Sequence, residues 1–136
     1  MREVVVGIIS KKDKEGKDLY LLVSTKKDFG KYTGFYYPPG GHIENDEREE
    51  QALIREIDEE LGVVVKPVSR LARLPNDIPN EVSCWWSCEL ISTDEHFVFK
   101  DGKVNAVAWL NEDEIRQRED IFPLTKKFFE EYIFKS

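Results

Sequence analysis

Three glutamates lie close together on one predicted helix of this chain. The helix is expected over residues 52–61 and should end at Gly62. Side chains three and four residues apart share one side of an α-helix, so Glu56, Glu59 and Glu60 should fall within about a third of its circumference. Like charges on one side repel one another unless a cation lies between them. Carboxylate oxygens suit a hard divalent ion, and Mg²⁺ commonly completes its shell with waters and substrate phosphates.

A solvated acidic helix face is the simpler interpretation, because most charge runs only keep a protein soluble. Two neighbouring features favour a site instead. A turn is predicted at residues 38–41, Pro-Pro-Gly-Gly, a short loop before the helix. An apolar stripe next to the glutamates places them beside a buried seam; it consists of Leu53, Ile54, Ile57 and Leu61.

A fixed spacing of residue types runs from Gly41 to Val63. Five residues separate Gly41 from Glu47, and seven more separate Glu47 from Arg55; the pattern continues with Glu56, Ile57, Glu59, Glu60 and Gly62. This segment resembles the Nudix box at every defining position. The resemblance implies an α/β/α sandwich with a mixed β-sheet. It also implies a Mg²⁺- or Mn²⁺-dependent hydrolase that cuts the diphosphate linkage of a nucleoside diphosphate derivative.

The resemblance also implies roles for individual residues. Glu56, Glu59 and Glu60 correspond to the metal-binding carboxylates, and a backbone carbonyl of Gly40 or Gly41 would be a further ligand. Arg55 and Glu47 correspond to an ion pair that orients the loop before the helix. An ordinary surface ion pair, worth less than about 1 kcal/mol, is the alternative interpretation of these two residues.

A water molecule that attacks phosphorus needs a base. Glu56 and Glu59 are candidates on the helix, while family members also recruit a glutamate from a loop outside the box. Glu81, Glu89 and Glu95 are the outside candidates, and we favour Glu95 because residues 92–95 form a polar segment between two expected strands. A turn glutamate without a role is the alternative.

The substrate is less well defined than the reaction. Tyr36 lies three residues before Pro39, where many relatives have an aromatic residue, and either stacks on a base or packs in the core. Trp86 and Asn105 are further candidate base contacts. Pro79 follows Val63 by sixteen residues, an offset seen in relatives that split ADP-ribose. A non-catalytic Nudix-like module that binds a nucleotide or a protein is the alternative function.

Length and composition agree with a small enzyme, and the resemblance implies a nucleotide-type substrate. Its 136 residues fit a single domain over residues 1–136, and the net charge of −7 with no basic stripe disfavours general nucleic-acid binding. The chain has no apolar run long enough for a membrane span and no signal peptide, so a cytoplasmic location is expected. Cys84 and Cys88 would lie about 13 Å apart on a strand, so both are predicted to be free thiols in the core. A homodimer is left open.

The remaining pattern predicts an α+β protein. Residues 3–10 and 19–24 should form a hairpin, with further strands at residues 63–74, 82–91, 96–99 and 105–110. Asn111 should cap a helix that extends to Arg118, and Pro123 should open a second helix over residues 124–134. Strands around one glutamate helix and two C-terminal helices predict a mixed sheet that is covered on both faces.

Overall fold

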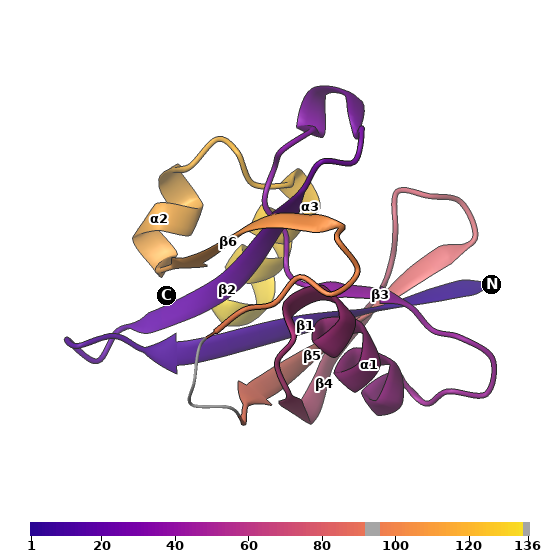
Figure 1. Ribbon diagram of the computed structural model, residues 1–136. Helices are drawn as coiled ribbons and strands as arrows, with labels where there is room; N and C mark the ends of the chain where they lie inside the picture. Colours follow the sequence, from indigo (N-terminus) through magenta and orange to yellow (C-terminus); the bar gives the residue numbers. More distant parts are fainter. Residues whose placement is uncertain (92–95, 135–136) are drawn as a thin grey trace.

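A six-stranded mixed β-sheet forms the centre of the protein (Figure 1). The computed structural model describes residues 1–91 and 96–134. The strand order is β4-β5-β1-β2-β6, and β3 also pairs with β1. The pair β1 and β5 is parallel, whereas the other strand pairs are antiparallel. The strand bounds are Arg2–Lys12 (β1), Asp18–Thr25 (β2), Gly40–His42 (β3), Val65–Pro75 (β4), Glu81–Leu90 (β5) and Val104–Leu110 (β6).

Helices cover both faces of this sheet, as the sequence predicted. Helix α1, Glu49–Leu61, lies on one face, while α2, Glu112–Gln117, and α3, Pro123–Phe128, lie on the other (Figure 1). Neighbouring strand residues point to opposite faces, so each strand contributes to two cores. In β1, Val5 packs in the core beneath α1 and Ile8 packs in the core beneath α3.

Helix α1 begins three residues before the predicted start and ends where the sequence placed its end. Gly62 follows the helix with a φ of 69°, a left-handed conformation that glycine adopts without a side-chain penalty, and its N–H donates to the carbonyl of Asp58. The predicted apolar stripe is wrong at Ile54, which is 40% exposed. The other three members of the stripe are fully buried, because they lie on the narrower arc of the helix that faces the sheet.

The predicted turn at residues 38–41 is wrong, because Gly40 and Gly41 belong to the short strand β3. This strand pairs with β1, opposite Val6 and Val5. A Cβ atom on Gly40 would lie 1.9 Å from the carbonyl oxygen of Val5. Glycine is therefore needed here for close packing of two backbones, and turn formation is not the reason.

The predicted strand at residues 96–99 is also wrong. This segment has no strand pairing and instead packs along the end of α1, where the Val98 N–H donates to the Leu61 carbonyl at 2.9 Å. The Asp101 N–H donates to the Glu59 carbonyl at 3.0 Å. The last carbonyls of a helix lack partners within the helix. The apolar residues of the segment suit docking on a helix end as well as they suit a sheet.

The hairpin and the other predicted strands are confirmed, with ends that differ by a few residues. Asn111 caps α2 by accepting from the Glu114 N–H at 2.9 Å. The last predicted helix is shorter than expected: α3 ends at Phe128 and continues as one π-helical turn, Phe129–Ile133. Cys84 and Cys88 are free and buried. No helix in the described part of the chain has the length and apolar character of a membrane span.

Candidate active site

Two of the three box glutamates, Glu56 and Glu60, lie where α1 passes β3. Glu60 is 6% exposed, and its Oε1 accepts a hydrogen bond from the Gly40 N–H at 3.0 Å. Glu56 lies so close to Gly41 that a Cβ atom there would be 2.3 Å from the Glu56 carboxylate. The side chain of Glu59 is the most open of the three at 47%. The two glycines therefore let the backbone of β3 reach the carboxylates directly.

The environment of the two inner carboxylates disfavours their negative charge. Burial raises the pKa of Glu60 to about 8, although the hydrogen bond from Gly40 opposes the shift. Burial also raises the pKa of Glu56, and the neighbouring Arg55 only partly compensates. Buried carboxylates of this kind are stabilised in their charged form by a nearby cation.

Arg55 joins the helix to the loop that precedes it. Its guanidinium forms a two-pronged ion pair with Glu47, from Nε to Oε2 at 2.7 Å and from Nη2 to Oε1 at 2.8 Å. Nη2 also donates to the His42 carbonyl at 3.0 Å, and Nη1 donates to Glu56 Oε1 at 2.9 Å. The hydrogen bonds from Arg55 lower the pKa of Glu47 to about 2. One side chain thus fixes the end of β3, the following loop and a box carboxylate together.

Two charged residues that the sequence did not single out lie beside this cluster. Asp101 and Lys103 belong to the connection that docks on the end of α1, and the Lys103 N–H donates to Asp101 Oδ1 at 3.0 Å. After burial, the charge of Asp101 further raises the pKa of Glu60, whereas Lys103 lowers it. Lys103 likewise lowers the pKa of Glu56. The only sequence signal for these residues was the turn-forming Asp-Gly pair directly before β6.

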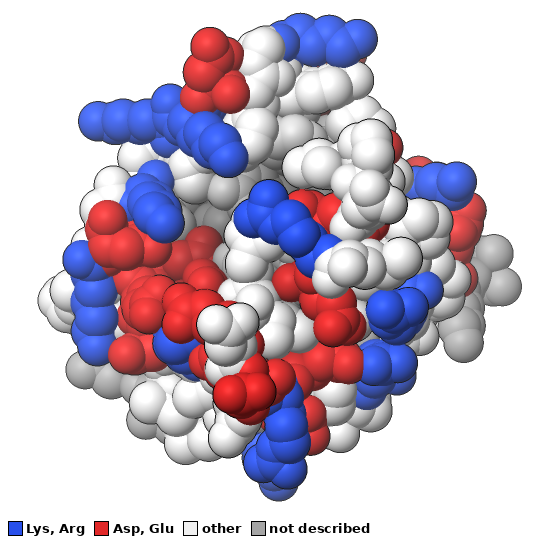
Figure 2. All heavy atoms as spheres, turned by 90° about the vertical axis from the view of Figure 1, so that its right-hand side faces the viewer, with Lys and Arg blue, Asp and Glu red and all other residues white. Residues whose placement is uncertain are grey.

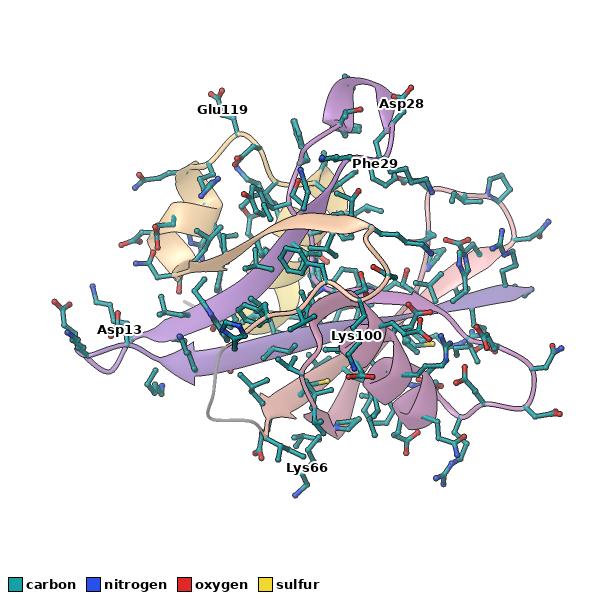
Figure 3. The ribbon with its side chains drawn as sticks, in the orientation of Figure 1. Asp13, Asp28, Phe29, Lys66, Lys100 and Glu119 are labelled. Carbon is teal, nitrogen blue, oxygen red and sulfur yellow. The ribbon has the colours of Figure 1, made fainter. Side chains whose placement is uncertain are left out.

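The same connection is held to the outside of α1 by an ion pair. Lys100 Nζ donates to Asp58 Oδ1 at 2.8 Å, and Figure 3 shows Lys100 over the helix. Acidic side chains form a broad band on the neighbouring face of the molecule, with Lys and Arg side chains around its edge (Figure 2). This face of the molecule is therefore negative with a basic border.

Of the three outside candidates for the base, Glu81 and Glu89 have no contact with this cluster in the described part of the chain. Glu95 lies outside the described residues. Glu81 is buried at the first residue of β5, where it accepts from Asn76 Nδ2 at 2.6 Å and lies 3.4 Å from His42 Nε2. Glu89 is exposed near the other end of β5.

Tyr36 and Tyr37 point to different faces of the sheet. Tyr36 packs against the core beneath α3, and the Arg118 guanidinium lies 5.1 Å from its ring centroid. Tyr37 packs against the core beneath α1. Burial raises the pKa of Tyr37, and the nearby charge of Glu60 adds to the shift. Tyr37 is therefore the aromatic residue of this pair that borders the glutamates.

The other two candidate base contacts have different surroundings. Trp86 Nε1 donates to Glu49 Oε1 at 2.7 Å, and Asn105 is exposed on β6. Ligand-type atoms of Glu3, Glu49 and Cys84 lie within 4.8 Å of one another. Arg70 already forms an ion pair with Glu49 there. We interpret this second cluster as a polar contact beneath the start of α1.

The donor atoms at the box fit a divalent cation. Every side-chain donor is a carboxylate oxygen, from Glu56, Glu59 or Glu60, and such donors suit Mg²⁺ and Mn²⁺. Glu60 is buried and Glu56 is half-buried, so a bound cation would compensate their charge. The backbone of Gly40 and Gly41 reaches the same place and could offer a carbonyl ligand.

Residues 1–132 match the family model of the NUDIX domain. The chain belongs to the NUDIX family. Among curated proteins, it is 36% identical over 76 residues to the NAD-capped RNA hydrolase NudC of Mycobacterium bovis (strain BCG / Pasteur 1173P2), a match that covers 56% of this chain and 24% of that protein. It is 43% identical over 47 residues to the 8-oxo-dGTP diphosphatase of Proteus vulgaris, covering 35% of this chain and 42% of that enzyme. The chain thus spans less than half the length of these relatives.

Solved NUDIX structures have the same fold. A NUDIX hydrolase from Nitrosomonas europaea has a TM-score of 0.75 at 23% identity, covering 96% of this chain and 70% of that one. An ADP-ribose pyrophosphatase from Streptococcus suis 89-1591 has a TM-score of 0.67 at 18% identity, covering 91% of this chain and 81% of that one. The NUDIX fold is therefore shared at low sequence identity.

Proposed function

We propose that this NUDIX protein hydrolyses the diphosphate linkage of a nucleoside diphosphate derivative or a nucleoside triphosphate with the help of Mg²⁺ or Mn²⁺. The observation that carries the proposal is that Glu56 and Glu60 lie against the glycine strand β3. Arg55 Nη1 also lies 2.9 Å from Glu56 and 3.4 Å from Glu59. Glu60 is buried and Glu56 is half-buried, in surroundings that favour a bound cation. Relatives named as hydrolases of NAD-capped RNA and of 8-oxo-dGTP support the same reaction class.

In this proposal Glu56, Glu59 and Glu60 hold the cation, with a carbonyl of Gly40 or Gly41 as a further ligand. When bound, a divalent cation neutralises substrate phosphates and lowers the pKa of a coordinated water. The Arg55–Glu47 ion pair positions β3 and the Glu56 carboxylate. Lys103 lies at the border of the acidic cluster, where its ammonium group would bind a substrate phosphate.

The base that accepts a proton from the attacking water would be a carboxylate beside this cluster. Glu56 and Glu59 are candidates on α1, and Glu95 remains a candidate in the loop. Asp101 is an additional loop candidate, because its connection is anchored to the Glu59 carbonyl and its charge acts on Glu60. A carboxylate that is not needed as a metal ligand could serve as the base without loss of the cation.

Turnover of a substrate panel by the parent protein and two matched variants tests the proposed reaction. The panel contains ADP-ribose, 8-oxo-dGTP and NAD, each incubated with Mg²⁺ or Mn²⁺, and the released products are resolved. Glu59→Gln and Glu60→Gln should each remove most turnover while the fold remains stable. Glutamine at position 60 keeps the acceptor for the Gly40 N–H and removes an unfavourable buried charge.

Near-normal turnover in both glutamine variants at saturating Mg²⁺ would contradict the metal-site assignment. Binding of a panel compound without turnover, under both cations, would instead favour a non-catalytic NUDIX module. The presence of all box carboxylates favours the enzyme, because a binding module has no need for three of them. Exchange of Glu50 for Gln, on the same helix but outside the box positions, is the control for a general effect of charge removal.

A further inference from the structure

An aromatic cluster connects the glutamate site to a small cavity. Phe122 lies at its centre, with ring centroids 5.4 Å from Tyr37, 5.3 Å from Phe29 and 5.6 Å from Tyr32. Burial raises the pKa of Tyr37, and the charge of Glu60 adds to the shift. Figure 3 shows Phe29 at the foot of the short 3₁₀ helix η1, Gly30–Tyr32. The rings therefore form a continuous path from Tyr37 to η1.

The cavity lies at the far end of this path, between η1, the start of α3 and the connection from β4 to β5. Its volume is about 240 Å³. Pockets for whole small-molecule ligands usually measure about 300 to 1,000 Å³, so this one suits a single ring system better than an entire nucleotide. The lining consists of Tyr32, Asp77, Phe122, Pro123, Leu124 and Lys127.

The chemistry of this lining suits a flat ring with a polar edge. Tyr32 and Phe122 supply aromatic surface, and Leu124, which is 37% exposed, supplies an apolar side chain. Asp77 adds a carboxylate that accepts hydrogen bonds, and Lys127 adds an ammonium group that donates them. Neither residue forms an ion pair with another residue in the described ranges 1–91 and 96–134. An apolar pocket with a few convergent polar groups is the usual form of a ligand site.

We propose that this cavity binds the base of the nucleotide substrate, an inference that rests on the proposed function. A nucleobase has a π-face that can stack on Tyr32 and an edge that carries both N–H donors and carbonyl or ring-nitrogen acceptors. The N–H groups would face Asp77 and the acceptors would face Lys127. The diphosphate would then extend along the aromatic path toward Lys103 and the box carboxylates.

This assignment differs from the three base contacts expected from the sequence. Tyr36 packs against the core beneath α3 and Trp86 is hydrogen-bonded to Glu49, while Asn105 is exposed on β6. None of these three side chains lines the cavity. Tyr32 and Phe122 come from segments far apart in the sequence, so only the fold brings them together.

Binding of GMP, AMP and ribose 5-phosphate to the metal-free protein tests the base site without any need for hydrolysis. NMR titrations should give weaker binding for ribose 5-phosphate than for the two nucleotides. Tyr32→Leu should weaken nucleotide binding by about 5- to 140-fold, since stacking of a base on an aromatic side chain contributes about 1 to 3 kcal/mol. Tyr32→Phe keeps the ring and should bind within a few-fold of the parent.

Two exposed positions keep the test valid if Tyr32→Leu fails to fold. Lys127→Gln and Asp77→Asn should each weaken nucleotide binding by about tenfold or more, because each removes a hydrogen bond to a charged group. Ribose 5-phosphate binding should not change. Lys17→Gln, in the distant hairpin tip, is the matched control and should bind like the parent.

Equal binding of GMP and ribose 5-phosphate, with no effect of the Tyr32, Asp77 and Lys127 exchanges, would overturn the base site. Failure of the proposed reaction looks different: nucleotides would still bind in a Tyr32-dependent manner, but no panel compound would be hydrolysed. If hydrolysis occurs, Tyr32→Leu should raise KM with little change in kcat. A parental KM in that variant would also overturn the assignment.

Discussion

Exchange of Gly41 for alanine should damage the proposed metal site without unfolding the protein. A Cβ atom at this position would lie 2.3 Å from the Glu56 carboxylate, whereas ordinary contact begins at 3.4 Å. The carboxylate would therefore have to retreat by about 1 Å, although Arg55 Nη1 holds its Oε1 at 2.9 Å. A displacement of about 1 Å in a reacting group can cost about 10²-fold in rate. We expect kcat/KM of Gly41→Ala to fall by about that factor.

Gly40→Ala is the matched control because its obstacle is backbone. Its Cβ atom would meet the Val5 carbonyl oxygen at 1.9 Å, and two paired strands cannot separate without a loss of stability. This variant should be destabilised by more than about 4 kcal/mol or fail to fold. The thermal midpoint of Gly41→Ala should instead stay within a few degrees of the parent, because the end of a side chain can move.

The assays are steady-state kinetics on the substrate panel, Mn²⁺ titration and thermal unfolding of both variants. A parental kcat/KM in Gly41→Ala would refute the argument that close contact between β3 and Glu56 matters for the reaction. Equal destabilisation of the two alanine variants would refute the distinction between the side-chain and backbone obstacles.

Arg55→Gln should lose the stabilising ion pair with Glu47, whose pKa in the folded protein is about 2 against an ordinary 4.5. A depressed carboxyl pKa stabilises the fold above pH 4.5, and this contribution is lost as the pH falls from 4.5 through 2. The difference in thermal midpoint between parent and variant should therefore be largest near neutral pH and decrease as the pH is lowered. A difference that stays constant with pH would contradict the stabilising role of this ion pair. Single-turnover kinetics of Asp101→Asn and Glu95→Gln distinguish the two candidates for the base outside the helix. The variant that lacks the base should carry out the chemical step about 10²- to 10⁴-fold more slowly, with Mn²⁺ affinity nearly unchanged. Rates within a few-fold of the parent in both would return the role to the helix. Lys103→Gln should lower kcat/KM by about tenfold or more, because the variant loses a charged hydrogen bond to phosphate. If kcat/KM of the variant equals that of the parent at every salt concentration, Lys103 does not contact the phosphate.

The glutamate helix was predictable because its spacing, its buried side and its closing glycine depend on nearby residues alone. The alternation of apolar residues likewise predicted most strands. Residues 96–99 were assigned wrongly because their composition fits either a sheet or a helix end, and only tertiary packing decides between them. The strand β3 was missed because glycine also favours turns, and the close approach of β1 cannot be seen locally.

The surroundings of the site were less predictable than the box itself. Asp101 and Lys103 reach the carboxylates only because their connection docks on α1. Tyr36 and Tyr37 are adjacent in sequence, and a shift of one residue along an extended segment exchanges the two faces of the sheet. Tyr32 and Phe122 meet through the fold alone, so no spacing in the sequence links them.

The docking of residues 98–101 on the end of α1 also has a consequence for local opening of the protein. The amides of Val98 and Asp101 bond to the carbonyls of Leu61 and Glu59, so their hydrogen exchange with solvent reports whether this connection is closed. Release of the connection would free the last helical turn, which carries Glu59 and Glu60. A change in residues 98–101 that removes no charge could therefore still weaken cation binding through the backbone, and faster exchange of these two amides would reveal it.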